Sequence, residues 1–113
     1  MKDFYRNYVN VNPKLDVNNS YIIYNNTVST TEEIRYYTPE KDGVVIIACS
    51  FRQAAKVFVD ALKNDGKTIR LGSIVQSANS AGADNGVMMI PVISGELLTI
   101  KGRNFSAEYY PYL

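Results

Sequence analysis

Residues 54–75 read AAKVFVDALKNDGKTIRLGSIV, and this stretch decides whether the fold is all-β. Its first half alternates apolar and polar positions, which is typical of a strand with one buried face. The positions that share the apolar face are Ala55, Val57, Val59 and Ala61. Asp65-Gly66 then favours the tight turn whose twist matches two antiparallel strands. Because residues 68–75 also alternate, we expect a β-hairpin over this stretch.

The same stretch has one alternative interpretation, a helix that ends near Gly66. Several of its apolar residues are spaced as on one face of a helix, and a glycine at this place is a common helix terminator. These residues are Ala54, Val57, Phe58, Ala61 and Leu62. We favour the hairpin, because an Asp-Gly turn followed by a second alternating run is typical of paired strands.

Short apolar runs separated by turn residues continue on both sides of the hairpin. Residues 39–43 form a turn, because proline presets φ and glycine accepts a positive φ. Pro91 breaks a strand at 87–90, since proline cannot donate to a ladder and belongs at an edge, a bulge or a strand end. Residues 101–104 form another turn. The other expected strands are 21–24, 34–38, 43–50, 97–100 and 105–113.

This pattern of short apolar runs separated by turn residues predicts an all-β fold, a jelly-roll β-sandwich of about 8–10 short antiparallel strands. The length of 113 residues suits one domain. Residues 1–30 are polar and rich in Asn, so we expect them to form an extended lead-in or a first strand. Residues 31–113 then form the jelly-roll head.

Charge and hydropathy exclude several classes of protein. Twelve Lys and Arg against eleven Asp and Glu give a net charge of +1, so no clustered positive surface is expected and nucleic acid is not a predicted partner. The chain contains no apolar run of about 18 residues, so no transmembrane helix and no membrane insertion are expected. The start of the sequence lacks the apolar core of a signal peptide.

The residue types also argue against catalysis. The sequence contains no His, which excludes Ser-His-Asp and Cys-His mechanisms and most zinc sites. Its one cysteine, Cys49, lies in an apolar run and is expected to be a buried, unreactive thiol. We therefore expect a non-enzymatic protein without a cofactor or a metal.

Acidic residues offer two candidate sites that we weigh and set aside. Asp84-Asn85-Gly86 supplies oxygen ligands of the kind that calcium prefers, but the spaced ligand set of an EF-hand is absent. A glycosidase needs two carboxylates at a defined separation across a cleft. The acids available for such a pair are Glu32, Glu33, Glu40 and Asp42. We expect these side chains to lie in solvated turns.

The nine tyrosines lie in two terminal blocks, with none between residues 38 and 108. A jelly roll can place its first and last strands side by side, which would gather these rings into one patch. Tyrosine combines an apolar ring with a polar tip and is enriched at interfaces. We therefore predict a subunit interface, with ordinary aromatic packing in the core as the alternative. The residues assigned to the interface are Tyr24, Tyr36, Tyr109, Tyr110 and Tyr112.

Residues 76–86 are small and polar and form the best candidate for an exposed loop. Loops on a rigid scaffold often carry recognition, and polar side chains there supply hydrogen bonds. The predicted receptor-contact residues are Asn79, Ser80, Asp84 and Asn85, and an ordinary connecting loop is the alternative.

Over residues 34–113 the chain resembles the trimeric C1q/TNF-like jelly-roll heads at the tips of bacteriophage tail fibres and related virion fibres. The resemblance depends on a short set of turns and strands in the matching order. These are Tyr37-Thr38-Pro39-Glu40-Lys41-Asp42-Gly43-Val44-Val45, the hairpin from Lys56 to Gly66, Ile90-Pro91-Val92 with Ser94-Gly95-Glu96, and the ending Ala107-Glu108-Tyr109-Tyr110-Pro111-Tyr112-Leu113. Ser94 stands where the family often has Lys, and Glu96 where it often has Asp.

The resemblance implies a homotrimer with its terminal strands facing the three-fold axis. It also implies a virion or extracellular location, contact with a bacterial surface glycan or protein, and contacts with other virion proteins. Two alternatives stay open. One is a purely structural trimerisation module, and the other is a carbohydrate-active domain, against which the absence of His argues.

Overall fold

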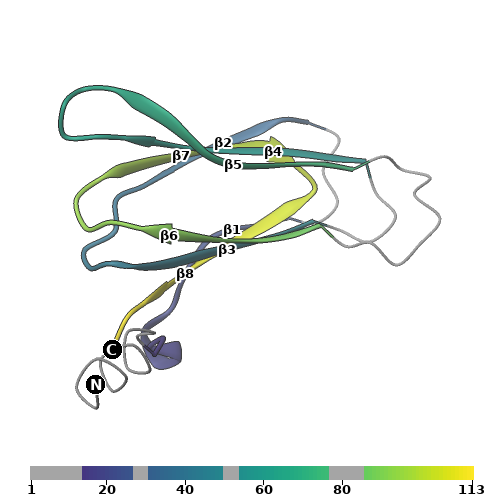
Figure 1. Cartoon of the computed structure of the whole chain (residues 1–113). Coiled ribbons are helices and arrows are strands. Elements are labelled where there is room, and N and C mark those ends of the chain that lie inside the picture. Colours follow the sequence, from purple (N-terminus) through teal and green to yellow (C-terminus); the bar gives the residue numbers. More distant parts are fainter. Residues whose placement is uncertain (1–13, 27–30, 50–53, 77–85) are drawn as a thin grey trace, which may run out of the picture.

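The computed structural model describes residues 14–26, 31–49, 54–76 and 86–113, and in them the chain is a two-layer sandwich of antiparallel strands (Figure 1). After a short 3-10 turn, η1 (Val17–Asn19), eight strands follow in order. They are β1 (Tyr21–Asn26), β2 (Glu33–Tyr37), β3 (Gly43–Cys49), β4 (Ala55–Leu62), β5 (Thr68–Gln76), β6 (Val87–Val92), β7 (Leu97–Arg103) and β8 (Phe105–Pro111). The predicted all-β class is confirmed.

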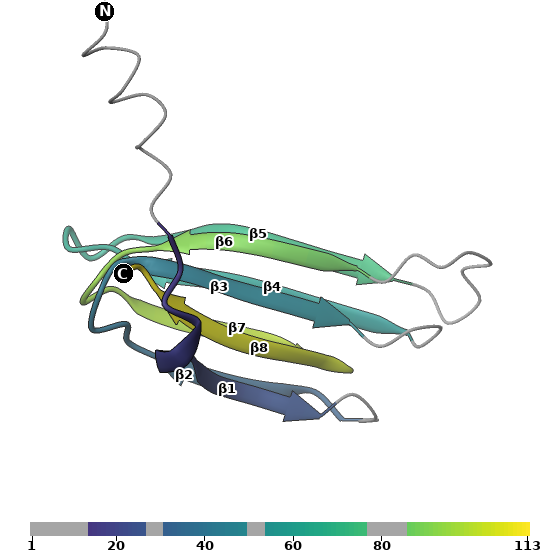
Figure 2. The ribbon, with the colours of Figure 1, turned by 90° about the horizontal axis from the view of Figure 1, so that it is seen from below.

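The strands divide into a first sheet with the order β1-β8-β3-β6 and a second sheet with the order β2-β7-β4-β5. Viewed through the two layers, β1 lies over β2, β8 over β7, β3 over β4 and β6 over β5 (Figure 2). Successive strands therefore alternate between the sheets, except at the β4–β5 hairpin, where both strands belong to the second sheet, and every strand pair is antiparallel.

The hairpin prediction is confirmed, and the alternative helix over this stretch is wrong. β4 pairs with β5 from Ala55↔Gln76 to Leu62↔Thr68, with a register shift between Val59 and Asp60. Gly66 has φ +85°, as the turn requires. The four alternating apolar residues of β4 are all buried, because this face lies against the first sheet.

The core fills the space between the two sheets. Its largest fully buried side chains include Ile47 of β3, Leu98 and Ile100 of β7, and Phe105 of β8. Cys49 is also buried there, as expected. Burial of these apolar side chains provides the main stabilisation of a sandwich of this kind.

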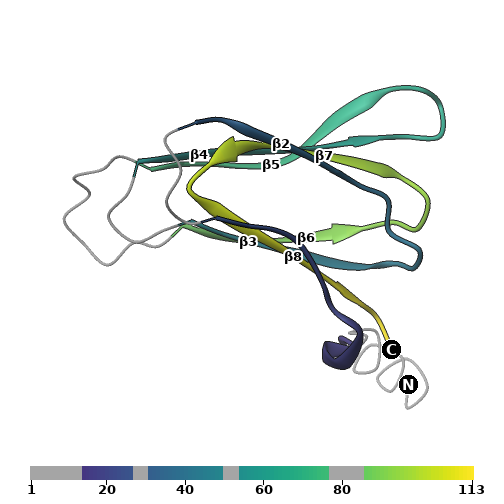
Figure 3. The same cartoon turned by 180° about the vertical axis from the view of Figure 1, so that it is seen from behind.

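Two strands continue through residues where the sequence predicted a break or a turn. β6 continues through Pro91 to Val92, because β6 is the edge strand of the first sheet and needs no donor on its outer side. β7 continues through residues 101–103, and the reversal takes place at Asn104, which has φ +57°. There the chain crosses from the second sheet to the first (Figures 1 and 3).

The N-terminal part of the described chain belongs to the sandwich. β1 pairs with β8 from Tyr21↔Tyr109 to Asn26↔Phe105, with a register shift between Ile22 and Tyr24. Leu15 forms a bridge with Tyr112 just beyond β8. The sequence predicted either an extended lead-in or a first strand within residues 1–30. In the structure, residues 21–26 form a first strand.

Candidate functional site

The five tyrosines assigned to an interface occupy three different places. Tyr24 and Tyr109 are buried in the core of the single chain, with 8% and 4% of their surface exposed. Tyr36 is 65% exposed and lies on the outer side of β2 in the second sheet. Tyr110 and Tyr112 are half-buried and belong to or follow β8 in the first sheet. The structure therefore does not gather these rings into one surface patch.

Tyr21 of β1, Tyr37 of β2 and Tyr109 of β8 form an aromatic cluster, in which Tyr109 is buried, Tyr37 is half-buried and Tyr21 is 53% exposed. The ring of Tyr37 lies 5.0 Å from that of Tyr21 and 5.2 Å from that of Tyr109. Tyr24 packs at 4.7 Å from Phe105. Burial raises the pKa of Tyr37 and of Tyr109. This cluster closes one side of the core, which is a structural role.

The outer side of the first sheet is apolar on β3 and β6, whereas the outward positions of β8 and β1 include Ser106, Glu108 and Asn25. Strand positions alternate between the two faces, and cross-strand partners share a face. Ile46 is the cross-strand partner of both Glu108 and Met89, and Glu108 is also the partner of Ile22. These four side chains therefore lie on one side of the sheet. We call this surface the apolar face. Its apolar members are Ile22, Val44, Ile46, Ala48, Val87, Met89, Pro91 and Tyr110.

Three of these side chains are well exposed in the single chain. Ile22 is 58%, Val87 60% and Met89 61% exposed. Val87 and Met89 lie together on the edge strand β6, whereas Ile22 lies on β1 at the opposite edge of the sheet. Exposed apolar side chains that lie together on a surface are typical of an interaction site.

The apolar face carries almost no charge. Glu108 is the one charged residue in the four strands of the first sheet. The hydroxyl of Tyr110 donates to Oε1 of Glu108 at 2.8 Å, and this bond to the carboxylate raises the pKa of Tyr110. The face therefore offers little to a partner that binds through complementary charge.

The outer side of the second sheet carries more charged side chains than the apolar face does. Its outward positions carry Lys56, Asp60, Arg70, Lys101 and Arg103, beside the exposed apolar side chains of Ile34, Tyr36 and Val75. Several of these residues line a hollow of about 590 Å³ around Phe58. We call it the charged hollow. Nε of Arg70 lies 2.7 Å from Oδ1 of Asp60, and Nζ of Lys101 lies 3.5 Å from Oε1 of Glu32.

The sequence interpretation did not single out the charged hollow. Its residues come from separate strands, and only the pairing of β4 with β5 and β7 brings them together. The available signal was the polar half of the alternation in residues 55–75, where Lys56, Asp60 and Arg70 occur.

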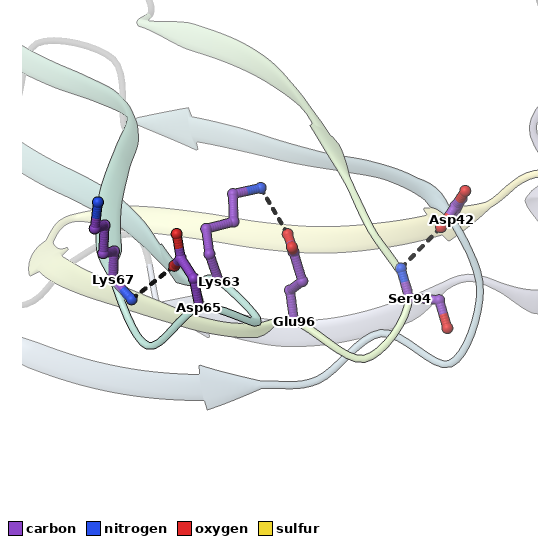
Figure 4. Close-up of polar contacts among 6 residues, drawn as sticks. All are labelled: Asp42, Lys63, Asp65, Lys67, Ser94 and Glu96. Carbon is purple, nitrogen blue, oxygen red and sulfur yellow. Dashed lines mark hydrogen bonds and ion pairs between the residues drawn. The ribbon is translucent and has the colours of Figure 1, made fainter.

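The turns that carry the resemblance meet at one end of the sandwich (Figure 4). The backbone N–H of Ser94 donates to Oδ1 of Asp42 at 2.8 Å, and the N–H of Gly95 donates to the carbonyl of Pro39 at 2.9 Å. Nζ of Lys63 lies 2.7 Å from Oε1 of the buried Glu96. These contacts tie the β2–β3, β4–β5 and β6–β7 turns together and give this end a structural role.

Three of the four acids considered for a glycosidase pair are engaged in separate contacts. Glu32 contacts Lys101, Glu33 contacts Arg35, and Asp42 accepts the bond from Ser94. Among the described residues, no group of three or more His, Cys, Asp or Glu is placed to hold a metal ion. Burial raises the pKa of Cys49 to about 11, so its thiol stays protonated at neutral pH.

The four predicted receptor-contact residues, Asn79, Ser80, Asp84 and Asn85, lie outside the described residues, and so does most of the Asp84-Asn85-Gly86 segment. In the described part of the chain, no helix is long and apolar enough to cross a membrane. Comparison with models of protein families, with curated proteins and with solved structures finds no match for this chain.

Proposed function

We propose that this chain is a non-enzymatic jelly-roll module that assembles as a homotrimer through its apolar face. In a jelly roll, eight strands in two Greek keys fill two facing sheets. The order β1-β8-β3-β6 against β2-β7-β4-β5 supports this topology, because the first, eighth, third and sixth strands share one sheet.

The observation that carries the proposal is the difference between the two outer surfaces. An antiparallel sheet that faces water on one side alternates apolar and polar positions. β4 follows this rule, with Lys56 and Asp60 on its outer side. β3 does not, because its outward positions are Val44, Ile46 and Ala48. A central strand without a polar outward position supports burial of the first sheet against another protein surface.

A second copy of the same chain is the partner that fits this surface best. Homo-oligomer interfaces are more apolar than other interfaces and depleted in charge at their centre. The single charge on the face, Glu108, already accepts a hydrogen bond from Tyr110. β1 and β8, the first and last strands, lie side by side in this sheet, which agrees with terminal strands around a three-fold axis.

The biological setting of the proposal rests on the resemblance to virion fibre heads. In that setting the trimer decorates a virion or fibre and contacts a bacterial surface receptor. A trimerisation module without a receptor would have the same apolar face, and binding of the purified protein to bacterial cells separates these two functions. Cleavage of glycans by the purified protein would contradict the non-enzymatic assignment.

Light scattering on the purified chain at micromolar concentration tests the assembly. We expect a mass three times that of the 12.7 kDa chain. A monomer under these conditions would overturn the proposed trimer and remove the role of the apolar face.

A further inference from the structure

Two cations face each other across neighbouring strands in the charged hollow. Lys56 of β4 is the direct cross-strand partner of Arg103 of β7, so both side chains leave the same side of the second sheet. Like charges directly opposite one another destabilise a sheet. Within the described part of the chain, neither side chain forms an ion pair. A local arrangement that opposes stability without compensation is typical of a functional site.

Phe58 lies next to this pair and contacts cations from two strands. The guanidinium carbon of Arg70 lies 4.4 Å from the centre of the Phe58 ring, and Nζ of Lys56 lies 5.5 Å from it. Cation–π contacts of this kind hold a cation in place without neutralising it. The ring therefore positions positive charge at the centre of the hollow.

The carboxylates that line the charged hollow form ion pairs with other cations and not with Lys56 or Arg103. Asp60 pairs with Arg70, and Glu32 pairs with Lys101. Lys56 and Arg103 thus contribute positive charge that no described carboxylate balances. An oxyanion placed between them would be attracted by both and would remove their mutual repulsion.

We propose that the charged hollow binds an anionic saccharide, with a carboxylate or phosphate group held between Lys56 and Arg103. Its volume of about 590 Å³ is that of a small-molecule site and exceeds what a single oxyanion needs. Asp60 and Thr99 also line it, and they offer a carboxylate and a hydroxyl to the hydroxyl groups of a sugar.

The lining favours a saccharide over a nucleic acid. A nucleic acid carries a phosphate on every nucleotide, whereas the hollow offers one uncompensated pair of cations beside Asp60 and Glu32, which suits a ligand with a single anionic group. Binding of single-stranded nucleic acid also relies on aromatic rings that are free to stack on bases. Here the ring of Phe58 is already contacted by Arg70 and Lys56.

The inference rests on the proposed function as a binding module, but its site lies on the sheet opposite the apolar face. Binding is measured by calorimetry with a tetrasaccharide that carries one uronate and with a tetrasaccharide that carries one phosphate group, which distinguish a carboxylate from a phosphate ligand. A neutral tetrasaccharide, inorganic phosphate and oligo-dT serve as comparisons. We expect one of the two anionic probes to bind at least tenfold more tightly than all three comparisons.

Arg103→Glu is the decisive variant, because it places an acid opposite Lys56. We expect it to weaken binding of the anionic probe at least tenfold while the melting temperature stays unchanged or rises. Lys67→Gln, which removes an exposed cation in the β4–β5 turn, should bind as the parent does. Lys56→Gln provides a second variant and should also weaken binding.

Several outcomes would overturn the saccharide site. They are no binding of either anionic probe at millimolar concentration, equal binding of the neutral tetrasaccharide or of inorganic phosphate, tighter binding of oligo-dT, and unchanged binding by Arg103→Glu. Light scattering on the same samples reports the oligomeric state separately. A trimer that binds no probe therefore contradicts this site alone, and a monomer that binds contradicts only the proposed assembly.

Discussion

Nζ of Lys63 lies 2.7 Å from Oε1 of Glu96 and joins the end of β4 to the turn before β7 (Figure 4). Glu96 is 7% exposed, so its carboxylate is largely removed from water. A buried carboxylate depends on a partner, because water no longer solvates its charge. Removing one partner of this pair therefore measures how much the end of the sandwich with the β2–β3, β4–β5 and β6–β7 turns contributes to stability.

Lys63→Met should lower the free energy of unfolding by about 1–3 kcal/mol, because it leaves the Glu96 carboxylate without its partner. Lys67→Met is the matched control, since Lys67 lies in the same turn but is exposed. The control should change stability by less than about 0.5 kcal/mol. Urea denaturation at one fixed protein concentration measures both variants, and equal effects would show that the ion pair contributes nothing.

The two tyrosines buried in the core differ in how their hydroxyl groups are satisfied. The hydroxyl of Tyr109 donates to the carbonyl of Lys41 at 2.6 Å. The hydroxyl of Tyr24 is buried and has no hydrogen-bond partner among the described residues. We expect Tyr109→Phe to destabilise the fold by about 0.5–1.5 kcal/mol and Tyr24→Phe to be neutral or stabilising. Thermal melting of the two variants checks the difference, and the opposite order would contradict it.

The sequence was sufficient for the hairpin because local signals agreed there. Alternation in residues 55–62 and 68–76 and the Asp65-Gly66 turn all favour paired strands. The predicted turn at 101–104 failed because Gly102 was taken as a turn residue. In the structure Gly102 lies within β7, where a Cβ would lie against the carbonyl oxygen of Lys56 and 2.8 Å from Cα of Val57. Glycine is needed there for close strand packing, which no local pattern reveals.

The candidate sites were harder to predict because they depend on register between distant strands. In β1 the register shift between Ile22 and Tyr24 decides which side chains enter the core, and a shift of one residue exchanges the two faces. Composition near the termini therefore could not separate the buried Tyr24 from the half-buried Tyr110. The pairing of Lys56 with Arg103 likewise joins residues on β4 and β7, and it follows only from the strand order.

Cys49 should make the free energy of unfolding depend on pH in the alkaline range. Burial raises the pKa of its thiol from the ordinary value of 9.0 to about 11. The unfolded chain then releases this proton at lower pH than the folded chain does. The contribution of the protonated thiol is therefore complete below about pH 9 and is lost as the pH rises toward about 11.

Urea denaturation of the parent chain and of Cys49→Ala at about pH 8 and about pH 10.5 measures this effect. The parent should lose more stability than the variant between the two values. The remaining loss in Cys49→Ala is expected from Tyr37 and Tyr109, whose pKa values are also raised by burial. The same pH dependence in both proteins would show that Cys49 titrates normally.

A positive charge on the apolar face should break the proposed trimer. Met89 is 61% exposed on the edge strand β6, so Met89→Lys should leave the fold of the single chain intact. In the trimer the same lysine would be buried without a partner, which costs more than the lost contacts of Met89. We expect association to weaken at least about tenfold, or about 1.4 kcal/mol.

Ser73→Lys is the matched control, because Ser73 is exposed on β5, the edge strand of the second sheet. It adds the same charge to the opposite outer surface and should leave the mass measured by light scattering unchanged. Circular dichroism on both variants confirms that the sandwich is folded. Dissociation by Ser73→Lys but not by Met89→Lys would place the assembly surface on the second sheet, because only a charge buried between chains has this effect.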